Sequence, residues 1–458
     1  MSTTIRFSAV AAICFSLLAA PGSAAEWRAG VARVVITPSR PVWLSGYSSR
    51  DRLPDGKVHD LFAKAAAFES LDGTRLVIVT CDLGSMDPAI TAAVSSEVDK
   101  RYGLSRESLV LNVSHTHCAP EIAAERNVFH ALAPEEDAKL SRYVAEELQP
   151  KLIQLIGKAL DDLQPATLTV SHASAEFAKN RRFPTPDGFV NQPYADGVTD
   201  HDVPVMRILA DDGRLRGVLF GYACHNTTLA FYKFCGDYAG FAQAEVEAAH
   251  PGAVAMFVMG CGGDQNPYPR HGERGLEYCR QHGKELADAV GRALSGDQVE
   301  VHAPLRIASE VVSLELQPLP PRKRLEEQAA SATGHRKRKA RYLLEQIDEV
   351  GPIKLEQRCP LQAAQFGNEL LFLFFSGETV VDYSRRSKAE FAGPTVWVAG
   401  YCNDVFAYLP SLRVLQEGGY EGLTGIVHQL TPTPFAVSVE DRVMGGMRRL
   451  VRRVSQKD

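Results

Sequence analysis

The chain has 458 residues, 45% of them hydrophobic, and a formal net charge of -5. This length can bury a large core, and it allows two or three domains or one large α/β unit. The mildly acidic balance excludes the basic surface typical of nucleic-acid-binding proteins, so no nucleic acid partner is expected.

The first 25 residues have the features of a secretory signal peptide. Arg6 is the only early charge, residues 7–20 are mostly apolar, and small residues precede Glu26. The apolar run is shorter than the roughly 20 residues of an ordinary membrane span. We therefore expect a signal peptide at 1–25 and an exported chain, periplasmic or secreted. The catalytic domain would occupy 26–458, with a net charge of -6 after Arg6 is removed.

Apolar runs rich in Val, Ile, Leu and Phe alternate with amphipathic stretches along the rest of the chain. Strands are predicted at Arg75–Thr80, Ser108–Val113, Arg216–Tyr222, Ala253–Met259, Glu369–Phe375 and Thr395–Ala399. Helices are predicted at Pro88–Tyr102, Glu135–Leu163, Phe241–Ala249, Glu277–Leu294 and Arg324–Glu349. This alternation predicts an α/β fold with mixed, buried β-sheets flanked by helices. Open α/β sheets place their sites just past strand ends.

Four short motifs offer metal-binding side chains at the ends of these strand-like runs. They are Ser114–His117, Cys224–His225, Gly377–Glu378 and Asn403–Tyr408. Residues two apart on a strand face the same side, so we expect His115 and His117 to face one cavity. Histidine nitrogen and carboxylate oxygen are the usual ligands of a catalytic zinc, which keeps a position open for water. Together the motifs predict one zinc-type hydrolytic site.

Eight cysteines remain once Cys14 leaves with the signal peptide, an even number that an oxidising compartment can pair. Four of them, Cys118, Cys224, Cys261 and Cys402, lie beside the site motifs, which raises the alternative of thiolate ligands. No Cys-x-x-Cys spacing occurs. We therefore favour a mixture of disulfides and inert buried thiols.

From Arg28 to about Gly425 the chain resembles the catalytic N-terminal domain of the neutral or alkaline, non-lysosomal ceramidases, which are zinc amidases. The segments that carry the resemblance are Gly46–Tyr47, His59–Leu61, Ala63–Ala65, Ser114–Pro120, Asn180–Arg182, Ala223–Thr227, Cys235–Asp237, Gly240–Ala242, Gly377–Glu378, Arg385–Arg386, Tyr408 and Tyr420–Gly422. Each segment alone is a weak signal, but their order along the chain makes the set specific.

The resemblance implies one Zn²⁺ per chain and a role for each matching residue. The metal ligands would be His115, His225, Glu378 and Tyr408, and the residues serving the chemistry would be His117, Arg181 and Tyr420. Two imidazoles and one carboxylate leave zinc acidic enough to bring the pKa of a water towards about 7. His117 would exchange protons, while Arg181 and Tyr420 would donate to the developing oxyanion.

Each of these residues has a structural alternative. Imidazoles just after a buried strand need a hydrogen-bond partner in any case, and aromatic residues near strands are commonly core. The alternatives are an ion pair of Glu378 with Arg385 or Arg386, a core role for Tyr408 and Tyr420, a solvated loop charge at Arg181 or Arg182, and a site-wall or structural role for His59.

The chain departs from the family pattern at three places. Asn266 occupies the position of a serine proposed to act in catalysis, and an amide cannot be an alkoxide nucleophile. Ala119–Ile122 replaces a glycine-rich segment and brings Glu121 near the mouth of the site, which weakens the case for ceramide itself. The chain ends soon after the catalytic region, so we expect no C-terminal sandwich domain.

We therefore expect an exported zinc-dependent amidohydrolase of lipid and sphingolipid metabolism that uses zinc-activated water, with a ceramide-like lipid amide as the leading substrate. The alternatives are hydrolysis of another amide or ester by the same metal site, and a catalytically silent zinc-containing binding protein. Basic runs at Arg322–Arg324, His335–Lys339 and Arg448–Arg453 are either solvated faces or a peripheral membrane contact. The sequons at Asn112 and Asn226 overlap the site motifs, so glycosylation is not expected there.

Overall fold

The computed structural model describes residues 25–122 and 132–456. The predicted signal peptide at 1–25 lies almost wholly outside the described residues. In the described part of the chain, no helix combines the length and the apolar character needed to cross a bilayer.

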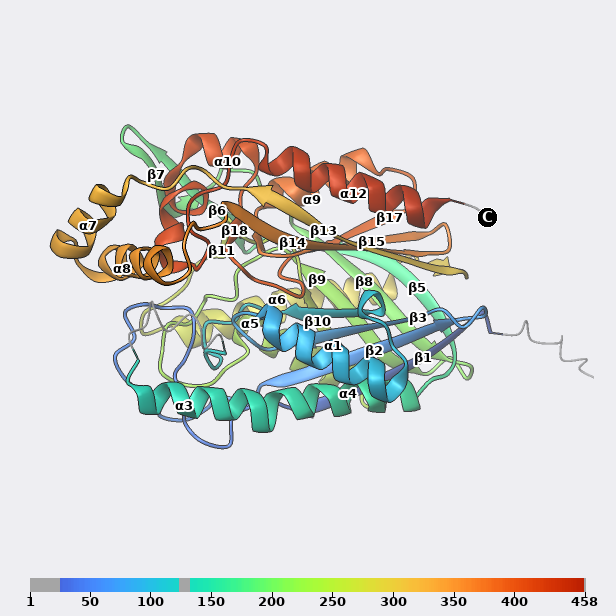
Figure 1. Ribbon diagram of the computed structural model, residues 1–458. Helices are drawn as coiled ribbons and strands as arrows, with labels where there is room; N and C mark the ends of the chain where they lie inside the picture. The colour runs from blue at the N-terminus through green and yellow to red at the C-terminus, as the bar shows by residue number, and fades with distance from the viewer. Residues whose placement is uncertain (1–24, 123–131, 457–458) are drawn as a thin grey trace, which may run out of the picture.

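Two β-sheets packed face to face form the centre of the molecule, and helices cover their outer faces (Figure 1). The larger sheet contains β1 (Trp27–Val35), β2 (Phe62–Ser70), β3 (Arg75–Cys81), β4 (Leu109–Val113), β5 (Gln164–Ser174), β8 (Asp202–Ala210), β9 (Leu215–Tyr222), β10 (Val254–Met259) and β12 (Val299–Val301). Its strand order is β10-β9-β8-β5-β1-β2-β3-β4, with β12 beside β5. The pairs β3–β4 and β9–β10 are parallel, and the other pairs are antiparallel.

The second sheet has the order β13-β14-β15-β17. Its strands are β13 (Leu305–Glu315), β14 (Glu356–Phe366), β15 (Leu370–Phe375) and β17 (Thr395–Ala399). Two small sheets lie near the site: β11 (Gln265–Pro267), β6 (Ala178–Thr185) and β7 (Gly188–Tyr194) form one, and β16 (Glu378–Thr379) and β18 (Tyr408–Leu409) form the other.

Helices close both outer faces. Those that pack on the larger sheet are α1 (Pro88–Tyr102), α4 (Gln149–Asp161), α5 (Asp237–Ala249) and α6 (Gly275–Ser295). The second sheet is covered by α9 (Val381–Glu390) and α12 (Val439–Ser455). The remaining helical segments are η1 (Arg106–Ser108), α3 (Pro134–Arg142), η3 (Tyr143–Leu148), α7 (Arg322–Ser331), α8 (Gly334–Glu349), α10 (Leu412–Glu417), α11 (Gly419–Gly422) and η4 (Thr424–His428).

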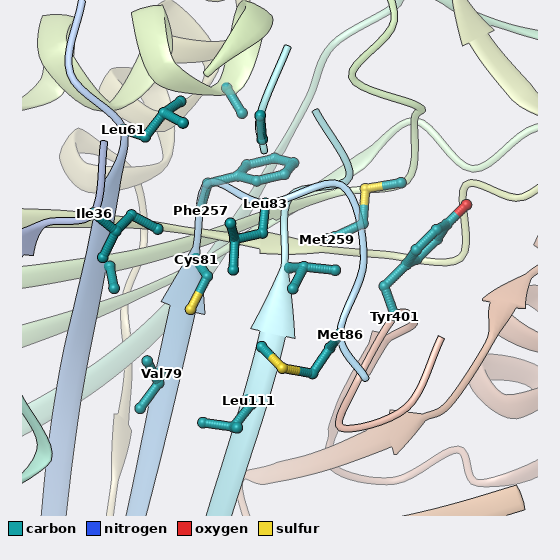
Figure 2. Packing of buried hydrophobic residues seen from close by; sticks show 14 of the residues in the cluster. Ile36, Leu61, Val79, Cys81, Leu83, Met86, Leu111, Phe257, Met259 and Tyr401 are labelled. Atoms are coloured by element: carbon teal, nitrogen blue, oxygen red, sulfur yellow. The ribbon is translucent and has the colours of Figure 1, made fainter. Parts of the chain in front are cut away.

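Successive side chains of a strand point to opposite faces of the sheet, and both faces are buried here, which explains the continuous apolar runs. In β3, Val77 and Val79 face the helices, whereas Leu76 and Ile78 face the second sheet and share a core with Phe372. Both faces of the strand are buried, so both sets of side chains must be apolar. Figure 2 shows the helix-side core where β3 and β4 end, with Leu111 and Met86 below and Tyr401 reaching in from the loop after β17.

The predicted α/β fold with mixed, buried sheets flanked by helices is confirmed. Each of the six predicted strands is present and lies within one residue of its predicted bounds. Helix Pro88–Tyr102 is present with the predicted bounds, and Glu135–Leu163 corresponds to α3, the π-helical turn η3 and α4 in succession. The single helix predicted at Arg324–Glu349 is wrong, because Ala332 and Thr333 are extended and Gly334 has a φ of 57°.

The buried side chain of Asn112 in β4 joins three parts of the fold. Its Oδ1 accepts from the Met259 amide at 2.8 Å, and its Nδ2 donates to the Gly400 carbonyl at 2.7 Å. Strands β4 and β10 stand at opposite ends of the strand order, and Gly400 follows β17 of the second sheet. Asn112 therefore holds three strand ends together in the interior. Its complete burial also agrees with the expectation that this sequon is not glycosylated.

Replacing Asn112 with alanine should destabilise the protein by about 2–5 kcal/mol, because the buried Met259 amide and Gly400 carbonyl would each lose a partner. Urea unfolding measures the change. The exposed Asn368 provides the control, since Asn368→Ala should shift stability by less than about 0.5 kcal/mol. Equal stability of the two variants would contradict the role of Asn112.

Candidate metal and active site

Three buried side chains from distant parts of the chain converge beside the ends of β4, β9 and β15. His115 follows β4, His225 follows β9, and Glu378 begins β16 just after β15. One ligand atom from each lies within 4.8 Å of those of the other two. Across the described ranges, this is the one group of histidine, cysteine and carboxylate side chains close enough to hold a metal.

The spacing of these atoms fits a zinc ion. Glu378 Oε2 lies 3.3 Å from His115 Nε2 and 3.4 Å from His225 Nε2. A tetrahedral zinc with bonds of about 2.0–2.1 Å holds neighbouring ligand atoms about 3.3–3.4 Å apart. Glu378 Oε2 is buried and has no well-formed hydrogen bond among the described residues. An unsatisfied carboxylate oxygen between two imidazoles is the arrangement that a bound cation would complete.

Backbone carbonyls fix both imidazoles in the tautomer that a metal requires. His115 Nδ1 donates to the Gly84 carbonyl at 2.5 Å, and His225 Nδ1 donates to the Gly262 carbonyl at 2.6 Å. With Nδ1 protonated, Nε2 carries the lone pair and points into the site.

The strand argument for His115 and His117 is wrong, although the two side chains do meet. Strand β4 ends at Val113, and His115 has a φ of 62°, in the left-handed region. His115 Nε2 and His117 Nε2 lie 3.1 Å apart because the loop turns both rings inward. Asn403, the first residue of another motif, faces away from this trio and accepts from the Leu111 amide at 3.0 Å.

Gly46 and Tyr47 pack against the ring of His117. A Cβ at Gly46 would lie 2.2 Å from His117 Cγ, so only glycine allows this approach. The Tyr47 ring meets His117 edge-on at 4.7 Å. His117 Nδ1 is buried and has no hydrogen-bond partner within the described ranges. Burial and the neighbouring His115 and His225 hold the pKa of His117 well below its usual value, which favours the neutral ring.

Arg181 on β6 links the metal trio to the wall of the site. Its Nη1 lies 3.2 Å from His225 Nε2, and its Nη2 donates to the Tyr408 hydroxyl at 3.0 Å. Arg181 is buried, and its Nε donates to Glu421 at 2.7 Å. The ion pair with Glu421 therefore compensates the buried charge and orients the guanidinium.

Asn266 lies beside Arg181 because β11 pairs with β6. Its Oδ1 accepts from Arg181 Nη1 at 3.2 Å, and its Nδ2 donates to Asn191 at 3.1 Å. The side chain is fully buried. Asn266 therefore occupies a position where it can orient a polar group but cannot supply a nucleophile.

A cavity of about 160 Å³ opens over His115 and Glu378 of the trio. Tyr408, beside Glu378 in the β16–β18 register, and Tyr420 on α11 both line it. The other described lining residues are Ser45, Gly46, Ser48, Gly84, Ser85, His115, His117, Glu121, His335, Glu378, Val405, His428 and Gln429. The sequence analysis did not identify His335 or His428 as cavity residues, because His335 lies in a basic run and His428 lies in a segment without a strand or helix pattern.

Electrostatics favour an ionised Glu378 carboxylate and a neutral His225. Burial alone would raise the pKa of Glu378, but the neighbouring His115 and His225 hold it well below its usual value. Burial, reinforced by the charge of Arg181, lowers the pKa of His225 to about 3. A neutral imidazole and a carboxylate are the states that bind zinc.

The contacts of Glu378, Arg182 and His59 bear on the structural roles that the sequence left open for them. Arg385 donates to the Thr199 carbonyl and Arg386 pairs with Glu440, so neither of them is the partner of Glu378. Arg182 pairs with Glu417 and Glu421 on the side away from the trio. His59 is not among the described cavity residues and contacts Cys235 and Phe241 instead.

The chain is similar to known proteins in both sequence and fold. A sequence model of the neutral/alkaline non-lysosomal ceramidase N-terminal domain matches residues 27–283. The neutral ceramidase of Pseudomonas aeruginosa is 25% identical over 277 residues, which cover 57% of this chain and 40% of that protein. The neutral ceramidase of Drosophila melanogaster is 24% identical over 213 residues, covering 45% of this chain and 29% of that one. The matched region thus spans less than half the length of either relative.

Two solved structures share the fold. The crystal structure of neutral ceramidase from Pseudomonas aeruginosa matches with a TM-score of 0.71 and 22% identity, over 94% of this chain and 74% of that one. A ceramidase complexed with C2 matches with a TM-score of 0.71 and 20% identity, over 95% of this chain and 77% of that one. The family match extends over more than half of the sequence, and the same fold underlies it, so the chain belongs to the neutral/alkaline non-lysosomal ceramidase family.

Proposed function

We propose that this chain is a zinc-dependent hydrolase that cleaves a C–N amide bond, with a ceramide-like lipid amide as the leading substrate. The observation that supports it best is the buried trio of His115, His225 and Glu378, whose atoms have the separation of zinc ligands. Membership of the ceramidase family supports amide chemistry in particular.

In this proposal His115, His225 and Glu378 hold one zinc ion, and the Tyr408 hydroxyl contributes from the cavity wall. When bound, zinc polarises an amide carbonyl and lowers the pKa of a water towards about 7. Tyr408 is aligned for this role, because its ring stacks over His225 at 6.3 Å and its hydroxyl is fixed by Arg181.

His117 handles protons. His117 Nε2 lies 3.1 Å from His115 Nε2, and the neutral ring of His117 faces the cavity. The ring can therefore take a proton from the attacking water and pass it to the leaving amine. The close contact with Gly46 and Tyr47 keeps the ring in one orientation.

Arg181 and Tyr420 stabilise the negative charge that develops on the carbonyl oxygen. The guanidinium is already oriented by Glu421, so no reorganisation is needed during the reaction. The Tyr420 ring lies 5.4 Å from that of Tyr408 at the exposed side of the cavity. Losing one such donor typically costs ~10²–10³ in turnover.

A second candidate, hydrolysis of a different amide or an ester, is favoured by the polar wall of the cavity. Ser45, Ser48, Glu121 and Gln429 line it, and Val405 is the one aliphatic side chain among its described lining residues. A substrate panel that compares ceramide with short-chain amides and esters separates the two candidates. A catalytically silent zinc protein is disfavoured, because a structural zinc needs neither His117 nor Arg181.

We also propose that the chain is exported, because residues 1–25 have the features of a signal peptide. Residues 26–458 are proposed to form one catalytic domain. Of the basic runs, Arg322, Arg448 and Arg449 pair with acidic residues of the chain, which favours solvated faces. A peripheral membrane contact remains a proposal for cations such as Arg336.

The purified mature protein should contain about one tightly bound zinc, and His115→Ala or His225→Ala should remove it, since each deletes one of the three clustered ligands. Zinc is measured by mass spectrometry of the dialysed protein. The exposed His302 is the matched control, because His302→Ala should keep the metal. Full occupancy in both ligand variants would exclude this site.

His117→Ala should retain zinc and fold but lower turnover by ~10²–10⁴, the usual contribution of a general acid–base group. Glu378→Ala should lose zinc and turnover together. Both are measured as zinc content and amide hydrolysis at several pH values. Undiminished turnover of His117→Ala would return this residue to a structural role.

Asn266→Ala should leave measurable activity, and Asn266→Ser should be tolerated, because water rather than a side chain is the nucleophile. Intact-protein and peptide mass spectrometry after brief incubation with substrate provides the check. A covalent acyl-enzyme trapped at any of residues 263–267 would contradict direct attack by water.

A further inference from the structure

A continuous wall of aromatic rings runs along one side of the cavity. Tyr408, whose ring stacks over His225, meets Tyr420 at 5.4 Å between ring centroids. Tyr420 lies 6.1 Å from His428, and His428 meets His335 at 4.3 Å. All four residues of this wall line the cavity. The wall therefore leads from the proposed metal ligands to His335 and His428, which have no part in the proposed chemistry.

Hydrogen bonds hold the outer half of this wall in place. Lys339 lies one helical turn after His335 on α8, and its Nζ is buried. It donates to the Gln429 carbonyl at 2.6 Å and to the Thr431 carbonyl at 2.7 Å. Gln429 directly follows His428, the last residue of η4. The two histidines are thus fixed to each other through the backbone, so the size of the cavity beside them is a property of the fold.

The cavity is too small to enclose a long hydrocarbon chain. Its volume is about 160 Å³. An engineered protein cavity of about 150 Å³ encloses one benzene molecule, roughly six carbon atoms. The cavity can therefore hold the scissile amide and only a few further atoms. A longer chain would have to leave through the mouth of the cavity and lie against solvent.

The chemistry of the lining favours a neutral group that both donates and accepts hydrogen bonds. Among the described lining residues, Val405 is the one aliphatic side chain. Glu121 and Glu378 also line the cavity, which disfavours an anionic ligand. Hydroxyl, amide and neutral imidazole groups each offer a donor and an acceptor, as the hydroxyl of a ligand does. The lining residues that carry such groups, apart from the tyrosines, are Ser45, Ser48, Ser85, His335, His428 and Gln429.

We propose that the cavity selects amides that carry a short, hydroxylated group beside the scissile bond, and that His335 and His428 determine this specificity by hydrogen bonding to its hydroxyls. The inference rests on the proposed function and names the substrate class of the same site. In an apolar tunnel, each methylene that a ligand buries strengthens binding about fourfold. The described lining offers a methylene chain one aliphatic contact, so hydroxyls close to the amide, rather than chain length, set the affinity.

The test measures binding of simple hydroxamates, which coordinate zinc through the hydroxamate group, to the zinc-loaded full chain by isothermal titration calorimetry. Butanohydroxamate and decanohydroxamate should bind within about threefold of each other, since the added methylenes stay in water. The trihydroxy counterpart of butanohydroxamate should bind about tenfold more tightly than butanohydroxamate, the gain expected from two net hydrogen bonds. The same dissociation constants are then compared in three variants.

His428→Phe and His335→Phe keep an aromatic ring in the wall but remove its hydrogen-bonding nitrogens. Each should lower the preference for the trihydroxy compound over butanohydroxamate about fivefold. The matched control is His302→Phe, at an exposed histidine outside the cavity, which should keep the wild-type preference. Zinc content and thermal unfolding confirm that each variant is folded and loaded.

Affinity that rises about fourfold per methylene from butanohydroxamate to decanohydroxamate would reveal an apolar tunnel and overturn the proposal. A wild-type preference that persists in both cavity variants would overturn the role of His335 and His428. Binding of no hydroxamate at all would overturn the zinc site, and this inference with it. Since calorimetry needs no turnover, the selective binding of hydroxylated hydroxamates by a chain that hydrolyses no amide would support the cavity chemistry and contradict the amidase assignment alone.

Discussion

The site depends on one buried hydrogen-bonded side chain that contributes nothing to the chemistry. The amide of Asn112 bonds to Met259 at the end of β10 and to Gly400 after β17. Because a buried amide without partners is costly, these three strand ends stay together. The loop that leaves β4 carries His115, and the loop that leaves β17 leads to Tyr408 at the start of β18. The loop after β10 supplies Gly262, whose carbonyl orients His225. One polar side chain in an apolar interior thus holds the ends of strands from both sheets together.

The backbone around His115 and Glu378 adopts unfavourable conformations where it brings these side chains together. His115, Tyr401 and Asn403 are non-glycine residues with positive φ, and Gly377 precedes Glu378 with a φ of 79°. Such conformations persist only where surrounding contacts impose them. The carbonyls of Gly84 and Gly262 then hold the two imidazoles with their lone pairs facing inward. The side chains of His115, His225 and Glu378 are therefore held in the arrangement that the proposed metal requires.

Sequence patterns anticipated six of the buried strands, because burial on both faces demands continuous apolar runs. They also singled out the motifs that bring His115, His225 and Glu378 together. They missed the other strands, among them β2, whose residues 65–67 are three consecutive alanines with no strand preference, and they merged α7 with α8 across an extended pair of residues. They also brought His115 and His117 together for the wrong reason, since the loop geometry has no signature in spacing. His335 and His428 were invisible because their place in the cavity depends on the packing of α8 and η4.

Part of the cavity wall comes from segments of the chain that hold no residue of the metal trio. His335 and His428 reach the cavity from α8 and η4, segments that supply none of the ligand trio and lie beyond residue 283, where the family match ends. His115, His225 and Glu378 instead lie beside the ends of strands that the two packed sheets hold in place. Substitutions in α8 or η4 can therefore alter which molecules enter without moving a ligand. Selectivity and reactivity are separable properties in this architecture, free to diverge at different rates.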